Sequence, residues 1–162
     1  PKLVIDYEEI DEPYDNFEIK NTSRPTAYYH ISVRNNGKER AKKCEGFVVS
    51  VERSILGQRV GGNLIKRTDK LKWAYESDFY SVDIEPLFET RKLDLFYVHA
   101  DSPHRLHLFT GPHEFRTGMP SYVEHGSFVI TVKVVSENAH TAMARFQVEG
   151  STDYRKLAIR RI

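Results

Sequence analysis

Residues 28–52 read YYHISVRNNGKERAKKCEGFVVSVE, and this stretch decides the fold because it joins two apolar runs through a polar turn. Side chains along a β-strand point alternately to opposite faces. One face of the first run carries Tyr29, Ile31 and Val33. The other face carries Tyr28, His30, Ser32 and Arg34. This mixture is typical of a strand with one buried side.

The turn between the two runs is Asn35-Asn36-Gly37, whose residue types tolerate a positive φ. In a regular second strand, one face would carry Phe47, Val49 and Val51. Cys44 is small and apolar enough to be buried, but it has the opposite parity. Both sets can face the core only if the strand holds an extra residue, so we expect a β-bulge near Gly46. We interpret Cys44 as a buried structural thiol rather than a nucleophile.

Short strands are predicted along the rest of the chain, with no helical periodicity of comparable length. They lie at residues 3–10, 16–21, 71–75, 82–84, 93–97, 106–109, 128–134, 142–148 and 155–162. We expect Trp73 to anchor the core, and Leu93, Leu95 and Tyr97 to share one face. The pattern predicts an all-β fold, an antiparallel two-sheet sandwich of about eight or nine strands.

Length and composition favour a single β-sandwich domain over residues 1–162, with long loops near residues 55–69 and 100–122. The first of these regions is rich in glycine and is expected to form a hairpin or a long loop. With 24 basic and 23 acidic residues, the net charge of +1 gives no global electrostatic reason to bind nucleic acid or an anionic membrane. One cysteine cannot form an intramolecular disulfide, so the compartment is not predicted.

Four segments resemble the immunoglobulin-like β-sandwich domains of bacterial and archaeal proteins. They are HISVRNNGKERAKKCEGFVVSVE (residues 30–52), the strand around Trp73, VDIEP (residues 82–86) and GSFVITVKVVSEN (residues 126–138). The cysteine pair of antibody domains is missing. The resemblance implies an interaction or accessory module appended to other domains, although the fold alone assigns no function.

The chain has no apolar run near 18 residues, so we predict no membrane segment within it. It begins at Pro1 rather than at methionine. Our hypothesis is therefore a soluble domain cut from a membrane-anchored or larger protein. The oligomeric state is not predicted.

A group of histidines is the main candidate for metal chemistry. It comprises His99, His104, His107 and His113, with His125 beyond it. Three or four imidazoles that converge can bind zinc or copper. The spacing matches no known metal motif, so hydrogen-bonded or solvated loop histidines are the favoured interpretation, and no cofactor is predicted.

Two charged groups allow weaker hypotheses. An acidic segment offers oxygen ligands for calcium at Glu8, Glu9, Asp11, Glu12 and Asp15. A basic group offers a phosphate-binding face at Arg59, Lys66, Arg67, Lys70, Lys72, Arg155, Lys156, Arg160 and Arg161. Neither group matches a recognised binding module, so solvated surface charge is the favoured interpretation of both.

Catalytic motifs are missing from the sequence. It contains no Gly-x-Ser-x-Gly elbow and no His-Glu-x-x-His helix, so we predict that the chain is not an enzyme. The leading hypothesis is a module that presents sheet edges or its two long loops to a protein partner. The alternative is a metal- or carbohydrate-binding accessory domain, with Tyr28, Tyr80 and Tyr122 as candidates for stacking on sugars.

Overall fold

The computed structural model describes residues 1–7, 18–19, 22–23, 25–55, 58–65, 68–74, 81–108, 123–124 and 126–162. Within these ranges the chain forms fourteen β-strands. In chain order they are β1 (Leu3–Asp6), β2 (Glu18–Ile19), β3 (Thr22–Ser23), β4 (Thr26–Asn35), β5 (Ala41–Ile55), β6 (Gln58–Asn63), β7 (Asp69–Lys70), β8 (Val82–Ile84), β9 (Thr90–His99), β10 (Arg105–Leu108), β11 (Val123–Glu124), β12 (Ser127–Ser136), β13 (Ala139–Glu149) and β14 (Ala158–Arg161).

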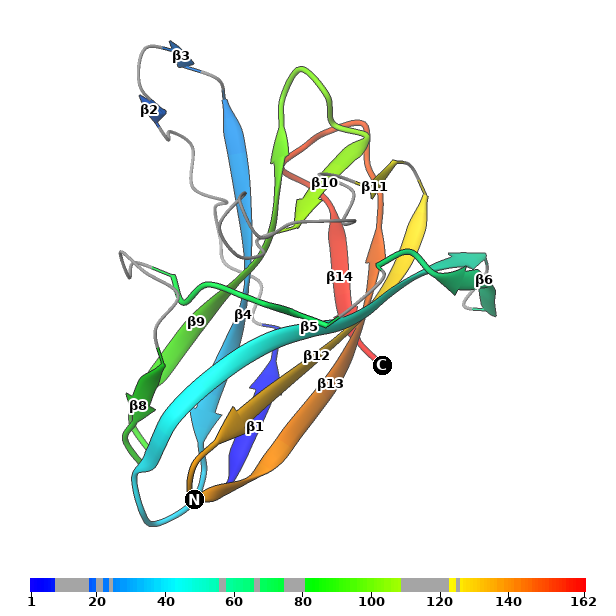
Figure 1. Ribbon diagram of the computed structural model, residues 1–162. Coiled ribbons are helices and arrows are strands. Elements are labelled where there is room, and N and C mark those ends of the chain that lie inside the picture. Colours follow the sequence, from blue (N-terminus) through cyan, green and yellow to red (C-terminus); the bar gives the residue numbers. More distant parts are fainter. Residues whose placement is uncertain are drawn as a thin grey trace.

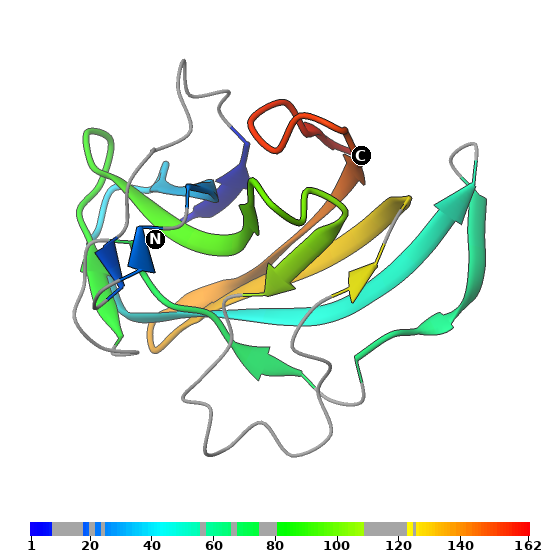
Figure 2. The same cartoon turned by 90° about the horizontal axis from the view of Figure 1, so that it is seen from above.

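The strands form two main antiparallel sheets, as the sequence predicted. One sheet has five strands in the order β1-β4-β9-β10-β11. The other has seven strands, in the order β14-β13-β12-β5-β6 with β7 and β8 also paired to β5, and β2 pairs separately with β3. Figures 1 and 2 show β4 and β9 in one layer and β5, β12 and β13 in the other. Nine of the described strands have four residues or more, in agreement with the eight or nine expected.

Strand β5 organises the seven-stranded sheet. It is 15 residues long, so it extends for about 50 Å at the usual rise of a strand. One edge pairs with β12. The other edge pairs in turn with β8, β7 and β6, so the downstream chain supplies three short strands in place of one long one.

Trp73 is a core residue, as predicted, with 1% of its surface exposed. Its indole Nε1 donates a hydrogen bond to the Cys44 carbonyl oxygen at 3.2 Å. The same segment pairs with β9, where Trp73 lies opposite Leu93. Residues 69–74 therefore run from the edge of one sheet to the edge of the other and close one side of the sandwich.

The faces of β5 differ from the expectation. Cys44, Val48 and Val51 are fully buried, whereas Phe47 and Val49 are half-buried. Two register shifts cause this, one between Ala41 and Cys44 and one beside Val49. The extra residue predicted near Gly46 is thus found at Val49, three residues further along, and a second irregularity precedes Cys44. The inward placement of Cys44 is confirmed.

A register shift in β9 corrects a second expectation. Tyr29 pairs with Phe96, but the next residue of β4, His30, pairs with Asp94, so Leu95 is an extra residue in β9. Phe96 therefore joins the core, and Tyr97 points to the opposite face. Leu93, Leu95 and Tyr97 do not share one face.

The turn after β4 does not use positive φ, since among the described residues φ is positive only at Lys43, Gly61, Leu87 and Gly126. Gly37 is required for a different reason. A Cβ at Gly37 would lie 2.7 Å from the Lys2 backbone nitrogen, so glycine lets the N-terminal segment pass close to the turn.

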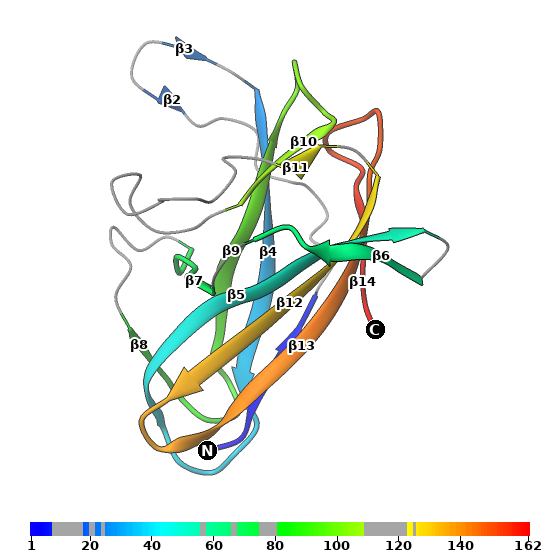
Figure 3. The ribbon, with the colours of Figure 1, turned by 45° about the vertical axis from the view of Figure 1, so that its right-hand side comes forward.

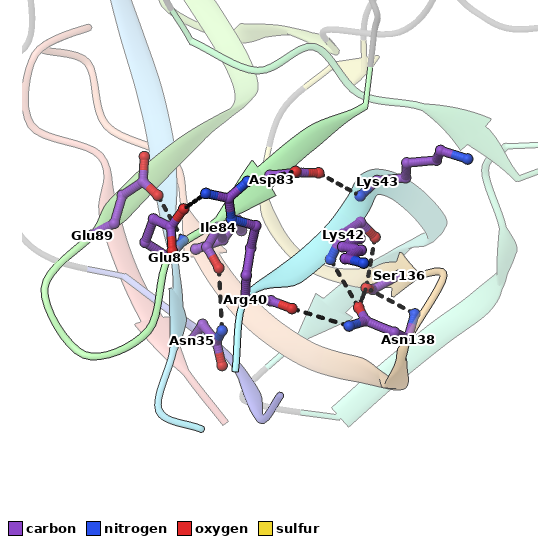
Figure 4. A network of polar contacts seen from close by, with 10 residues as sticks. All are labelled: Asn35, Arg40, Lys42, Lys43, Asp83, Ile84, Glu85, Glu89, Ser136 and Asn138. Carbon is purple, nitrogen blue, oxygen red and sulfur yellow. Dashed lines mark hydrogen bonds and ion pairs between the residues drawn. The ribbon is translucent and has the colours of Figure 1, made fainter. Parts of the chain in front are cut away.

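Polar contacts connect three loops at this end of the sandwich (Figure 4). Arg40 forms ion pairs with Glu85 and with Asp83, the latter at 3.6 Å. The Asn138 side chain accepts from the Lys42 backbone nitrogen at 2.8 Å and donates to the Arg40 carbonyl at 3.0 Å. These contacts fix the β4–β5 turn against β8 and against the β12–β13 turn.

Candidate functional site

The outer face of the five-stranded sheet gathers aromatic and titratable side chains. Cross-strand partners lie on the same face of a sheet. Here Thr26 lies opposite His99, Tyr28 opposite Tyr97, and His30 opposite Asp94. On β10, His107 lies opposite Tyr97. We call these seven residues the Tyr–His face.

The rings of the Tyr–His face contact one another. Tyr97 stacks on His107 with centroids 4.8 Å apart and planes 12° apart. His99 meets Tyr97 at 5.3 Å and His107 at 5.1 Å, both edge to face. Tyr28 lies 5.8 Å from Tyr97 with a tilt of 33°. Four rings from three strands thus form one continuous cluster.

Two polar contacts orient two of the imidazoles on this face, one an ion-pair contact and one a hydrogen bond. His30 Nδ1 lies 2.7 Å from an Asp94 carboxylate oxygen, and both side chains are less than a tenth exposed. His99 Nδ1 lies 2.8 Å from the Thr26 hydroxyl. Such contacts fix which ring nitrogen faces away from the partner, as they do in sites where histidine binds a ligand.

Burial disfavours the ionised form of Tyr28 on this face. Burial, followed by the proximity of Tyr97 and Asp94, raises the pKa of Tyr28 from 10.0 to about 12. The phenol therefore stays protonated at neutral pH and offers a ring face and a hydroxyl rather than a base.

The structure places the predicted histidines in different surroundings. It brings His99 and His107 together on the Tyr–His face, while His104 lies in the β9–β10 loop and lines a separate cleft. His113 and His125 lie outside the described residues. Within the described ranges, no group of three or more His, Cys, Asp or Glu side chains could hold a metal ion. The four-histidine metal site stays a hypothesis, with hydrogen-bonded or solvated loop histidines as the interpretation that the sequence favoured.

The cleft that His104 lines lies at the end of the sandwich opposite the network of Figure 4. Its volume is about 390 Å³. The β9–β10 loop, the start of β12 and the loop after β13 form its walls. It therefore opens between the two sheets.

The β5–β6 hairpin is one of two places outside these sites where neighbouring apolar side chains are exposed among the described residues, the other being Leu87 and Phe88 between β8 and β9. Ile55 is 62% exposed and Val60 is 45% exposed. Figures 1 and 3 show β6 projecting to the side, away from β4 and β9. The sequence interpretation left open whether residues 55–69 form a hairpin or a loop, and β6 decides for the hairpin.

The remaining candidates give no shared site among the described residues. Lys70 pairs with Glu45 at 2.5 Å and Lys156 with Asp153 at 3.5 Å. The acidic segment at residues 8–15, Lys66, Arg67, Tyr80 and Tyr122 lie outside the described residues, as does the side chain of Arg59. The thiol of Cys44 is fully buried, and burial raises its pKa, so it is not poised to act as a nucleophile.

Sequence reasoning missed Thr26, Asp94 and Tyr97 as members of a site. Thr26 lies on β4, whereas Asp94 and Tyr97 lie on β9, and they meet their partners across the strands only through a register that includes the β9 bulge. The nearest sequence signal was the polar parity of the first strand, where Tyr28 and His30 share a face.

A scan against protein-family models and a search of curated proteins found no match to this chain. Nothing in the described part of the chain forms a helix with the length and apolarity that a bilayer crossing demands.

Proposed function

We propose that this chain is a non-enzymatic interaction module that binds a protein partner through the β5–β6 hairpin. One observation carries the proposal: the core-facing side of the sheet continues along the hairpin, where Ile55 and Val60 are exposed. Exposed apolar side chains that lie together and are surrounded by polar residues mark sites of interaction with other proteins.

The strand register supports this interpretation of the hairpin. Phe128 is buried in the core and pairs with Arg53 of β5. Arg53 pairs in turn with Val60 of β6, and Ile55 follows Arg53 on the same face. The core-facing side of the seven-stranded sheet therefore extends along the hairpin, beyond the part that described residues of the five-stranded sheet cover.

The edge of the same hairpin supports a defined mode of binding. Among the described strands, β6 pairs with β5 alone and ends the order of the seven-stranded sheet. An open edge can accept an extended segment of a partner as an added strand. Backbone hydrogen bonds would then supply affinity, while Ile55 and Val60 would contact side chains of that segment.

A paired set of surface variants tests the proposal. The double variant Ile55→Ser, Val60→Ser removes the apolar contacts, and Met143→Ser is the matched control because Met143 is 56% exposed on β13. A photo-crosslinking residue at Gln58 should capture one discrete partner, and the double variant should lose that product while the control keeps it. Equal capture by both variants would refute the hairpin as the docking element.

The immunoglobulin-like topology belongs to the same proposal. The antiparallel layers and the buried Trp73 support it. Domains of this architecture serve as scaffolds on which edges and loops bind partners.

A second candidate function is ligand binding by an accessory domain, which the Tyr–His face favours. The centroids of His99 and His107 are 5.1 Å apart, a separation that two imidazoles bound to one metal ion can have. Calorimetric titration with zinc or copper should show stoichiometric uptake that His99→Ala abolishes and His140→Ala does not. Lack of uptake by the unaltered protein would remove the metal form of this candidate.

A further inference from the structure

We propose that the cleft at the end of the sandwich binds a single neutral sugar ring. The cleft lies between the sheets, since Leu106 belongs to β10 and Phe128 to β12. Ligand sites favour such concave junctions, and a volume of about 390 Å³ is at the small end of their usual range. This size suits one ring rather than an oligosaccharide.

Two glycines shape the wall of the cleft. Gly126 has a φ of 103°, a conformation that other residues rarely adopt. A Cβ at Gly150 would lie 3.3 Å from the Gly126 carbonyl oxygen. The residue before β12 and the residue after β13 are therefore close together, and neither has a side chain. Their peptide groups line the cleft directly.

The lining matches the two sides of a sugar ring. Leu106, Phe128 and Leu157 are at most 7% exposed and form an apolar floor. Ser127, Ser151 and Thr152 supply hydroxyl groups that can both donate and accept hydrogen bonds. A sugar has the same division, with apolar C–H groups on a ring face and hydroxyls around the edge.

The described lining of the cleft favours a neutral ligand over an ionic one. Among its described residues there is no Asp, Glu, Lys or Arg, and His104 is the one titratable side chain. Phosphate and carboxylate groups are normally bound by arginine, lysine or helix N-termini, none of which is among the lining residues that the structure describes. A neutral ligand can enter the cleft without the desolvation cost of burying an unpaired charge.

This inference rests on the second candidate function, that of an accessory ligand-binding domain, and is independent of the hairpin. The test is a titration followed by the backbone amide resonances of Gly126, Ser127 and Gly150. Glucose, galactose, mannose and N-acetylglucosamine are added separately, with glucuronate and glucose 6-phosphate as charged comparators. At least one neutral sugar should cause saturable shifts at these amides, and the charged sugars should bind more weakly.

Matched variants make the result specific to the cleft. Thr152→Phe fills the mouth and should weaken binding by about tenfold or more. Thr141→Phe places the same ring at another exposed threonine, on β13, and should bind like the unaltered protein. Thermal unfolding of both variants checks that each is folded, and Thr152→Val, which removes only the hydroxyl, provides a second variant should Thr152→Phe not fold.

Three results would overturn the inference. The first is that no neutral sugar causes a saturable shift. The second is that Thr152→Phe, or Thr152→Val if Thr152→Phe does not fold, binds sugar with unchanged affinity. The third is that a charged sugar binds more tightly than the neutral ones. The double variant Ile55→Ser, Val60→Ser should bind sugar normally. If the protein bound metal at the Tyr–His face but no sugar, the sugar-binding role of the cleft would be refuted, whereas the proposed function as a ligand-binding accessory domain would not.

Discussion

At the scale of single residues, Asn35 shows how one buried amide fixes a turn. It is 1% exposed, and its Oδ1 accepts hydrogen bonds from the backbone nitrogens of Lys2 and Gly37, both at 3.0 Å. Its Nδ2 donates to the carbonyls of Glu39 at 2.6 Å and Ile84 at 3.1 Å. Both donors and both acceptor sites are therefore used.

Replacing Asn35 should expose the cost of those four bonds. Asn35→Ala leaves four backbone groups in or near the interior without a partner, and we expect the free energy of unfolding to fall by about 3 kcal/mol. Asn138→Ala removes a similar set of bonds at an exposed site, where water replaces them, so it should cost about 1 kcal/mol or less. Denaturant unfolding measures both, and equal losses would contradict this account of the turn.

Tyr28 provides a pH dependence at the same scale. Its raised pKa means that, between pH 10.0 and about 12, the folded state holds the phenolic proton more tightly than the unfolded state does. Stability should therefore fall as pH rises through this interval. Tyr28→Phe should make the fall shallower, as measured by denaturant unfolding at a series of pH values. An unchanged slope would show that Tyr28 ionises normally in the folded protein.

The burial of individual residues could be predicted where period-two alternation holds, as at Tyr29, Ile31 and Val33. The roles of Asn35 and Tyr97 could not. Asn35 depends on the Lys2 nitrogen and the Ile84 carbonyl, which two other segments contribute, and the placement of Tyr97 depends on the extra residue Leu95. Both facts arise from pairing between distant segments, on which local sequence carries no information.

At the scale of elements, Gly46 of β5 controls how closely β9 approaches. A Cβ at this position would lie 2.3 Å from Leu93 Cδ2 and 2.7 Å from Leu93 Cδ1. The carbonyl oxygen of Gly46 also accepts a hydrogen bond from the Leu71 nitrogen at 2.8 Å. Gly46 is thus a point where β5, β9 and the segment that crosses between the sheets meet.

A double-mutant cycle tests this contact. Gly46→Ala should cost about 1–3 kcal/mol because the core has no room for the methyl group. Leu93→Ala should cost about 2–5 kcal/mol through the cavity it leaves. In the double variant the new methyl partly fills that cavity, so the loss should be smaller than the sum. Simple additivity would show that the two side chains do not compete for one space.

Among the elements, the β12–β13 hairpin was predicted well because its alternation is unbroken from Phe128 to Val134 and its turn is short. Strands β7 and β11 were not predicted, since each has only two residues and exists by pairing with a longer neighbour. Strand β6 also lacked a clear alternating pattern, because its sequence, QRVGGN, has one apolar side chain. Short edge strands take their structure from the sheet rather than from their own residues.

At the scale of the whole molecule, β5 belongs to two environments. Its central part, including Val48 and Val51, is buried and pairs with β12. Its end pairs with β6 and carries the exposed side chain of Ile55. Parts of a protein with little apolar burial open locally without global unfolding. We therefore expect one strand to show two levels of stability.

Hydrogen exchange at single amides checks this expectation. Amides of β12 that pair with β5 should exchange only through global unfolding, whereas amides of β6 should exchange far faster through separation of the hairpin. If that holds, Ile55→Ser and Val60→Ser will change stability little, so any loss of partner binding in these variants reports on the docking surface itself. Equal protection of β6 and β12 would instead place the hairpin within the cooperative core, and the same variants would then lose binding through unfolding.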